Sequence, residues 1–324
     1  MPTKNALIIG ISGQDGAYLA KLLLAEGYTV FGTSRDAQVS KFSNLQKLHI
    51  RHEVSCLSAN PSDFRSLLSA IRTAKPTEIY NLAGQSSVAL SFEQPVETFN
   101  SICIANLNIL EAIRFLDPQI KYYNAGSSEC FGNTIEPATE STAFHPRSPY
   151  GVAKAAAFWQ SANYRDSYNL FACSGILFNH ESPLRPERFV TQKIVRAAYR
   201  IASGAKEKLL LGNLDIERDW GFANDYVRAM WLMLQQDKPD DFIIASGETH
   251  SLKTFVSLVF NEFNLNWEEH VTSDPQLFRP SDILTSKASP EKARTRLGWT
   301  ARHNFRQLVQ CLVQDEIQRN KNTV

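Results

Sequence analysis

Residues 6–16, ALIIGISGQDG, decide the fold class of this chain. The apolar run from Ala6 to Gly10 predicts a buried strand, and the segment from Gln14 to Glu26 has leucines at helical spacing. Gly10, Gly13 and Gly16 lie where the strand passes into the helix, where glycine allows a tight turn and a close approach to a phosphate group. Free N–H groups at the helix start would bind the same anion. A glycine turn without a ligand is the alternative, but the strand before it and the helix after it favour a dinucleotide-binding loop.

Strands and helices continue to alternate as far as residue 179. Because alternating strands and helices pair in parallel through right-handed crossovers, the pattern predicts an α/β fold with a doubly wound parallel Rossmann sheet. Ligands of such a sheet bind at the carboxyl ends of its strands. Further strands are expected at 28–34, 54–57, 78–83, 120–128 and 171–179, and further helices after Ser62, Pro95 and Pro149.

The residues after 179 are less regular and predict a smaller, interleaved C-terminal substrate lobe. We expect residues 1–179 to form the dinucleotide-binding domain, with segments near 213–246 contributing to it, and residues 180–324 to form most of the second lobe. Helices are expected near 187–203, 223–236, 251–263 and 303–318, with short strands at 208–211 and 242–245.

The composition excludes several classes of protein. Hydrophobic residues make up 43% of the 324 residues and charged residues 21%, which is typical of a globular chain with a large core. A formal net charge of +1 gives no overall field to attract nucleic acid or an anionic membrane. The sequence also predicts no signal peptide and no apolar run long enough to span a bilayer.

The cysteines and histidines predict neither disulfides nor a metal site. The five cysteines are scattered and form no CxxC pair, so a reducing, cytoplasmic location is expected. His49, His52 and Cys56 have no fourth ligand at suitable spacing, and we interpret them as strand and loop residues.

The end of the second strand bears on the choice of nicotinamide cofactor. An acidic residue there usually binds the ribose hydroxyls of NAD. This chain has Thr33-Ser34-Arg35-Asp36, and the guanidinium of Arg35 suits the 2'-phosphate of NADP. NADP is therefore favoured, while Asp36 keeps NAD open and a solvated loop cation is the other reading of Arg35.

The residues with catalytic potential lie around the fifth strand. Tyr150 and Lys154 are four apart at the start of a helix, so both can reach one ligand, and an ammonium beside a phenol lowers its pKa. Ser127 and Glu129 follow the strand, where turn formation and a helix-start charge are the structural alternatives. Hydride removal needs only the Tyr/Lys pair and a hydroxyl, whereas an added carboxylate supplies a base for a C–H bond made acidic by a neighbouring ketone. The set therefore indicates elimination chemistry.

At these residues the sequence resembles the extended short-chain dehydrogenase/reductase superfamily and, more closely, its GDP-mannose 4,6-dehydratases. The likeness covers most of the chain, and FNHESP and GNLD..RDWG are far more specific than the glycine loop or YxxxK. The matching stretches are GISGQDGAYLA (10–20), YNLAGQSSVALSFEQP (80–95), RSPYGVAKAAAFW (147–159), GILFNHESPLRPERFVTQKI (175–194), LGNLDIERDWG (211–221) and RPSD (279–282).

The resemblance implies a role for each matching residue. Tyr150 would remove the C4 hydroxyl proton while NADP accepts the C4 hydride, Glu129 would take the C5 proton, and the hydride would return to C6 after water leaves. Ser127 would bind the O4 region and Lys154 the ribose. Implied cofactor contacts are Gly10, Gly13, Gln14, Asp15, Gly16, Arg35, Leu82, Ala83, Gln85, Tyr150, Lys154, His180 and Arg185. Implied substrate contacts are Ser87, Glu129, Asn179, Val190, Lys193, Gly212, Asn213, Arg218 and Arg279.

Solvent exposure is the structural alternative for these cations, and a satisfied structural histidine is the alternative for His180. The chain also departs from the family at three places. Ser127 replaces the usual threonine, Ala59-Asn60-Pro61-Ser62-Asp63 replaces an Asp-Leu pair near the adenine, and the arginine-rich loop that joins dimers into tetramers is reduced to residues 35–38. A homodimer through helices at about 97–115 and 149–167 is expected, with a tetramer possible.

Three other functions are consistent with the sequence. The same chemistry could act on another GDP-sugar such as a manno-heptose, the enzyme could be a 4-epimerase or 4-reductase, or the fold could serve a non-catalytic nucleotide-sensing protein.

Overall fold

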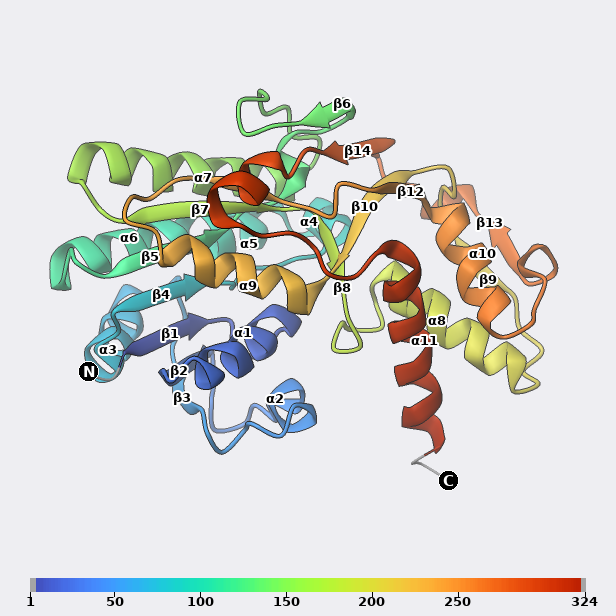
Figure 1. Cartoon of the computed structure of the whole chain (residues 1–324), viewed down its shortest axis with the longest axis horizontal. Helices are drawn as coiled ribbons and strands as arrows, with labels where there is room; N and C mark the ends of the chain where they lie inside the picture. The colour runs from blue at the N-terminus through green and yellow to red at the C-terminus, as the bar shows by residue number, and fades with distance from the viewer. Residues whose placement is uncertain (1–3, 322–324) are drawn as a thin grey trace.

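The computed structural model describes residues 4–321 and is built on a seven-stranded parallel sheet (Figure 1). The strand order is β11-β7-β5-β4-β1-β2-β3, so the chain starts near the middle of the sheet and winds outward in both directions. This order confirms the predicted doubly wound architecture. The strands are β1 (Asn5–Ile9), β2 (Thr29–Ser34), β3 (Ser55–Ser58), β4 (Glu78–Asn81), β5 (Lys121–Ala125), β7 (Ala172–Leu177) and β11 (Phe242–Ile244).

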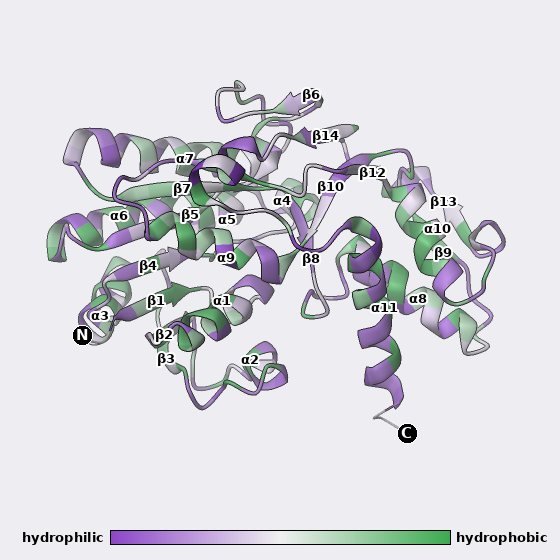
Figure 2. Ribbon diagram, viewed as in Figure 1, coloured by the Kyte–Doolittle hydropathy of each residue, from purple (hydrophilic) through white to green (hydrophobic). Residues whose placement is uncertain are grey.

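The central strand β1 is apolar because both of its faces are covered. Ala6 and Ile8 pack into the core on one face, and Leu7 and Ile9 into the core on the other. Successive side chains of a strand point to opposite faces, so a strand buried on both sides reads as a continuous apolar run. Figure 2 shows β1 as a strongly hydrophobic strand at the centre of the fold.

Helices cover both faces of the sheet. On one face α1 (Gln14–Ala25) packs against α9 (Ala223–Leu234), and on the other α6 (Ala105–Leu116) packs against α3 (Phe64–Ala74) and α7 (Pro149–Tyr168). The helix expected after Pro95 is interrupted. It consists of α5 (Pro95–Phe99), a π-helical turn at Asn100–Ile104 and α6.

The stretch Pro95–Leu116 is long and apolar enough to cross a membrane by length and composition, contrary to the expectation from the sequence. Its most apolar window is 44% buried within the fold. It packs on α3 and α7, which is the position of a core helix beside the sheet.

The second lobe is assembled from distant parts of the chain. Its larger sheet has the order β12-β10-β14-β6, with β8 also paired to β10, and a two-stranded sheet joins β13 to β9. The strands are β6 (Thr134–Ala138), β8 (Asn179–Glu181), β9 (Leu209–Leu211), β10 (Glu217–Phe222), β12 (Thr249–Ser251), β13 (Val271–Ser273) and β14 (Thr285–Ala288). The helices are α8 (Val190–Ala202), α10 (Leu252–Glu262) and α11 (Phe305–Lys321).

The two lobes exchange segments in both directions. After the second lobe has begun, α9 and β11 return to the first, and β11 becomes its edge strand beside β7. In the opposite direction β6, which precedes α7, pairs with β14. The sequence did not predict the short helices α2 (Ser43–Lys47) and α4 (Val88–Glu93), nor the strands β6, β8, β10, β12, β13 and β14.

Candidate active site

The turn between β1 and α1 requires glycine at two positions. Gly10 has φ +92°, and a Cβ on it would lie 2.9 Å from the backbone nitrogen of Ala83. A Cβ on Gly16 would lie 2.6 Å from the carbonyl oxygen of Gly10. Gly13 differs, because a Cβ there would meet nothing closer than 3.6 Å. Packing alone therefore does not require glycine at Gly13, whereas close approach of a phosphate would.

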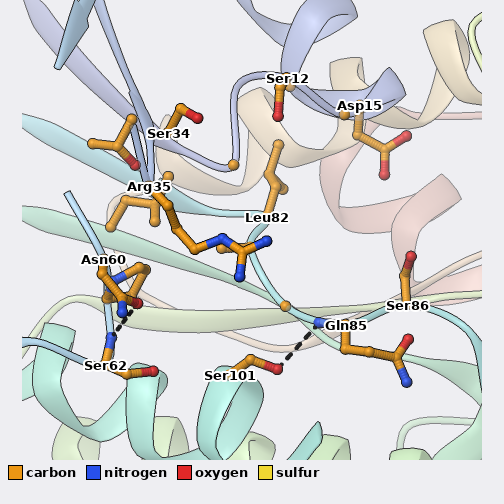
Figure 3. Close-up of a pocket in the computed structure, with 18 of the residues that line it drawn as sticks. Ser12, Asp15, Ser34, Arg35, Asn60, Ser62, Leu82, Gln85, Ser86 and Ser101 are labelled. Carbon is orange, nitrogen blue, oxygen red and sulfur yellow. Dashed lines mark hydrogen bonds between the residues drawn. The ribbon is translucent and has the colours of Figure 1, made fainter. Parts of the chain in front are cut away.

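This turn opens onto a cavity of about 1100 Å³, which we call the cofactor cavity. Its wall combines the turn with the ends of β2, β4 and the 59–62 loop, so it lies at the carboxyl edge of the sheet, where such folds bind ligands. Figure 3 shows the Arg35 side chain reaching across the cavity from the end of β2, with Asn60 and Ser62 beside it. The peptide N–H of Ser62 donates to Asn60 Oδ1 at 3.1 Å.

Asp36 does not line this cavity. Its Oδ1 accepts hydrogen bonds from the peptide N–H groups of Gln38 at 2.9 Å and Val39 at 3.3 Å, so the carboxylate is turned to its own loop. Ser34 and Arg35 both line the cavity. Asp36, the acidic side chain that could have bound a ribose without a 2'-phosphate, is thus bonded to its own loop instead of facing the cavity.

A second cavity of about 390 Å³, which we call the sugar cavity, contains the four residues expected to be catalytic. Ser127 follows β5 and caps a short 3-10 turn by accepting from the N–H of Glu129 at 3.2 Å. Tyr150 and Lys154 project from the first turns of α7, whose start is fixed by Ser148 accepting from the N–H of Gly151 at 3.0 Å. The structure therefore brings all four residues to one cavity.

Lys154 is buried and donates to the carbonyl oxygen of Ala125 at 2.7 Å, with its Nζ 5.8 Å from the centre of the Tyr150 ring. Burial lowers the pKa of Lys154 to about 8, because the ammonium loses hydration. Burial likewise raises the pKa of Tyr150 above its usual value, although the Ser127 hydroxyl opposes the shift. The expected lowering of the Tyr150 pKa is therefore not seen, because the loss of hydration on burial outweighs the lowering by the Ser127 hydroxyl.

Glu129 faces two arginines of the second lobe. Burial raises the pKa of Glu129, and the charges of Arg218 and Arg279 only partly offset that rise. A carboxylate with a raised pKa is a stronger base than an exposed glutamate. Arg218 is itself buried, which lowers its pKa, and one of its terminal nitrogens has no hydrogen-bond partner among residues 4–321.

Asp282 orients these arginines. Its Oδ1 lies 3.7 Å from Arg218 Nη2 and 3.8 Å from Arg279 Nη1. Arg218 also donates to the Glu217 carbonyl oxygen at 2.9 Å. The two guanidinium groups line the cavity near the carboxylates of Asp282 and Glu129, and guanidinium groups suit a diphosphate because they can donate paired, charge-assisted hydrogen bonds.

His180 is a fully bonded histidine at the boundary of the two cavities. Its Nδ1 lies 2.7 Å from the Phe178 carbonyl oxygen and its Nε2 lies 2.9 Å from Asp15 Oδ2. Burial raises the pKa of Asp15 and lowers that of His180, but their attraction outweighs burial, so the net pKa of Asp15 falls and that of His180 rises. These bonds leave no ring nitrogen for a ligand, which fits the structural alternative for this histidine.

Several other expected contact residues have their side chains engaged within the protein. Gln14 donates to the His180 carbonyl oxygen at 2.9 Å, and Gln85 donates to the Ser87 carbonyl oxygen at 2.8 Å. Lys193 donates to the Leu210 carbonyl oxygen at 2.7 Å, and Asn213 accepts from the N–H of Asp215 at 2.9 Å.

Nearly all of the expected residues nevertheless line a cavity; Asn213 lines neither. The cofactor cavity is lined by Gly10, Gly13, Gln14, Asp15, Gly16, Arg35, Leu82, Ala83, Gln85 and Arg185. The sugar cavity is lined by Ser87, Asn179, His180, Val190, Lys193, Gly212, Arg218 and Arg279, besides the four catalytic candidates.

Two residues of the site were not singled out from the sequence. Asp282 is part of the RPSD stretch, and its position three residues after Arg279 could have indicated that it lies near that arginine. Arg188 lines both cavities, and its position between two matched motif residues gave no indication of that. Within residues 4–321 no group of three or more His, Cys, Asp or Glu side chains could hold a metal ion.

Comparison with known proteins identifies the family. The model of the family described as GDP-mannose 4,6 dehydratase matches residues 7–312. The chain belongs to this family. It is 46% identical over 327 residues to GDP-mannose 4,6 dehydratase 1 of Arabidopsis thaliana, covering 98% of this chain and 91% of that protein. It is 44% identical over 341 residues to GDP-mannose 4,6-dehydratase of Sinorhizobium fredii, covering 97% of each chain.

Solved structures of nucleotide-sugar enzymes share the fold of this dehydratase-family chain. UDP-glucose 4-epimerase of Thermus thermophilus, in complex with NAD, has a TM-score of 0.85 and 25% identity, covering 96% of this chain and 98% of that chain. dTDP-glucose 4,6-dehydratase of Bacillus anthracis, also with NAD, has a TM-score of 0.86 at 18% identity, with 98% of each chain covered. At 18% identity the second comparison shows the fold alone.

The glycine turn predicts different effects for two alanine substitutions. Gly16→Ala should lower the free energy of unfolding by about 1–3 kcal/mol, because its Cβ would push against backbone atoms. Gly13→Ala should leave stability nearly unchanged but weaken dinucleotide binding. Urea denaturation and NADP titration measure the two effects, and equal destabilisation by both substitutions would contradict the assignment.

Proposed function

We propose that this chain converts GDP-D-mannose to GDP-4-keto-6-deoxy-D-mannose and water, using a bound nicotinamide dinucleotide. The observation that carries the proposal is that Ser127, Glu129, Tyr150 and Lys154 line the same cavity as Arg218 and Arg279. The names of the relatives support GDP-mannose as the substrate, and the NAD complex of UDP-glucose 4-epimerase supports a nicotinamide cofactor.

The residues of the two cavities fit the cofactor. Gly13 leaves the space that a phosphate needs, the N-terminus of α1 offers free N–H donors, and the cofactor cavity meets the sugar cavity at residues 82–86. A nicotinamide dinucleotide held by these residues would supply a reversible hydride acceptor for the sugar.

The side chains of the sugar cavity supply the proton transfers. Tyr150 takes the C4 hydroxyl proton, with Ser127 beside the same oxygen and the Lys154 ammonium stabilising the phenolate. The resulting 4-ketone acidifies the C5–H bond, and Glu129 removes that proton. Glu129 then gives the proton to the C6 hydroxyl, which leaves as water. Tyr150 returns its own proton to C5 as the hydride reaches C6, so both residues end in their starting states.

The proposed reaction is redox-neutral overall, and this property tests it. Enzyme with bound NADP should turn over GDP-mannose to a 4-keto product without accumulating NADPH. Stoichiometric consumption of NADPH would indicate a reductase instead. Retention of the C6 oxygen in the product would exclude a dehydratase.

Replacement of Glu129 should separate oxidation from elimination. Glu129→Gln is expected to lower kcat by about 100-fold or more, because the C5 proton loses its base. Oxidation at C4 does not need this carboxylate, so a single turnover should still produce bound NADPH, measurable by its absorbance. Glu136→Gln is the matched control, since Glu136 is exposed and lines neither cavity. Normal turnover of the Glu129 variant would remove the role assigned to this residue.

We further propose that NADP is preferred over NAD. Support comes from Arg35, which lines the cofactor cavity, and from Asp36, whose carboxylate is bound to its own loop. No acidic side chain among residues 4–321 forms an ion pair with Arg35, so its charge is free for a 2'-phosphate.

Arg35→Ala should raise the Kd of NADP by roughly tenfold to a hundredfold, the worth of one or two charge-assisted hydrogen bonds. The Kd of NAD, which lacks the phosphate, should hardly change and serves as the internal control. An equal loss of affinity for both dinucleotides would contradict the assignment of Arg35.

A homodimer through α5, α6 and α7 is part of the same proposal. These helices carry exposed apolar side chains, including Val96 (72% exposed), Phe115 (70%) and Trp159 (62%). Exposed apolar side chains grouped on neighbouring helices are typical of a protein interface. Sedimentation velocity should give twice the mass of the chain and would contradict the dimer if it gave a monomer. The five cysteines are all free in the structure, which supports the proposed cytoplasmic location.

A further inference from the structure

Arg188 lies where the cofactor cavity and the sugar cavity meet. It belongs to the segment between β8 and α8, in the second lobe, and lines both cavities together with Asp15, Arg185 and Phe189. Its guanidinium lies 5.2 Å from the centre of the Phe189 ring. The aromatic ring packs against the Arg188 side chain but does not neutralise the charge of its guanidinium.

The other charged groups at this junction compensate one another. Asp15 is paired with His180 at 2.9 Å. Arg185 Nε lies 3.3 Å from Glu181 Oε2. The Arg185 guanidinium carbon lies 3.9 Å from the centre of the Phe189 ring, which Arg188 also contacts. Both ring nitrogens of His180 face oxygen acceptors, so both carry a proton and the ring is positively charged. Two acids and two bases therefore cancel, and the charge that remains at the junction is that of Arg188.

Within residues 4–321 Arg188 has neither an ion pair nor a hydrogen bond to another side chain. The cations among the described residues that line the cofactor cavity are Arg35, Arg185 and Arg188. Arg35 lies at the end of β2 beside Ser34, and Arg185 is occupied by Glu181. Arg188 and Arg35 are thus the cations lining the cofactor cavity that have no acidic partner among residues 4–321, and Arg188 is the one at the junction, which Asp15 of the first turn of α1 also lines.

We propose that Arg188 binds the diphosphate of the nicotinamide dinucleotide, so that the second lobe helps to hold the cofactor. The inference rests on the proposed function for the identity of the ligand. A dinucleotide diphosphate carries two negative charges, and the N-terminus of α1 offers only partial positive charge against them. The diphosphate of a GDP-sugar has the same chemistry, but the sugar cavity already contains Lys193, Arg218 and Arg279.

The effect of Arg188 should be the same for both dinucleotides, since the diphosphate is common to NADP and NAD. Arg188→Ala is expected to raise the Kd of each by about tenfold and to weaken the salt dependence of binding, because one charge-assisted contact is lost. Arg188→Lys should restore part of the affinity. The Kd of GDP should change less than twofold.

Arg228→Ala is the matched control. Arg228 also rests on an aromatic ring, 5.9 Å from that of Trp231, but it lies on α9 and lines neither cavity. The Arg228→Ala variant should bind both dinucleotides like the wild type. The circular dichroism spectrum and the thermal unfolding of Arg188→Ala and Arg228→Ala should both match those of the wild type.

Unchanged Kd values for NADP and NAD in Arg188→Ala would overturn the inference. A loss of affinity for GDP alone would also overturn it, because Arg188 would then belong to the substrate site. Turnover of GDP-mannose by the wild type is measured separately. If turnover fails while dinucleotide affinity depends on Arg188, the proposed function is wrong and this inference stands.

Discussion

The hydrogen bond from the Lys154 ammonium to the Ala125 carbonyl oxygen, 2.7 Å long and buried, holds the candidate active site together. It fixes the first turns of α7 against the end of β5 and so places Tyr150 beside Ser127. A buried ammonium is costly unless it is bonded, and the pKa of Lys154 is lowered to about 8 by this burial. The ammonium, whose Nζ lies 5.8 Å from the centre of the Tyr150 ring, is thus held beside the phenol that we propose as the proton carrier.

The second lobe contributes arginine side chains to the sugar cavity. Arg218 is buried with an unpartnered nitrogen, and Asp282 lies at ion-pair distance from both Arg218 and Arg279. An unsatisfied buried donor is unfavourable by itself and is best explained by a ligand that would bind it. The same reasoning links the raised pKa of Glu129 to substrate binding, because a diphosphate on the arginines would reduce their pull on the carboxylate.

Much of the first lobe could be predicted from the sequence. The apolar run of β1, the glycines after it and the alternation of strands and helices are local signals, and the structure confirms the sheet that they predict. The four residues Ser127, Glu129, Tyr150 and Lys154 could be placed together because parallel strands end at one edge of the sheet.

The second lobe and the finer electrostatics could not be predicted in the same way. β6 and β14 are short strands separated by about half of the chain, and neither carries a strong periodic signal of its own. The pKa of Tyr150 depends on burial, which spacing in the sequence does not reveal. Asn213 lies in a matched motif, yet its amide oxygen bonds to the N–H of Asp215 and the residue lines neither cavity.

We propose that oxidation, elimination and reduction take place in one cavity on a single bound sugar. Turnover of GDP-mannose deuterated at C4, followed by mass spectrometry and NMR of the product, tests this sequence of steps. Deuterium is expected at C6 of the 4-keto-6-deoxy sugar, with no free reduced dinucleotide. Deuterium lost to solvent, or retained at C4, would contradict it.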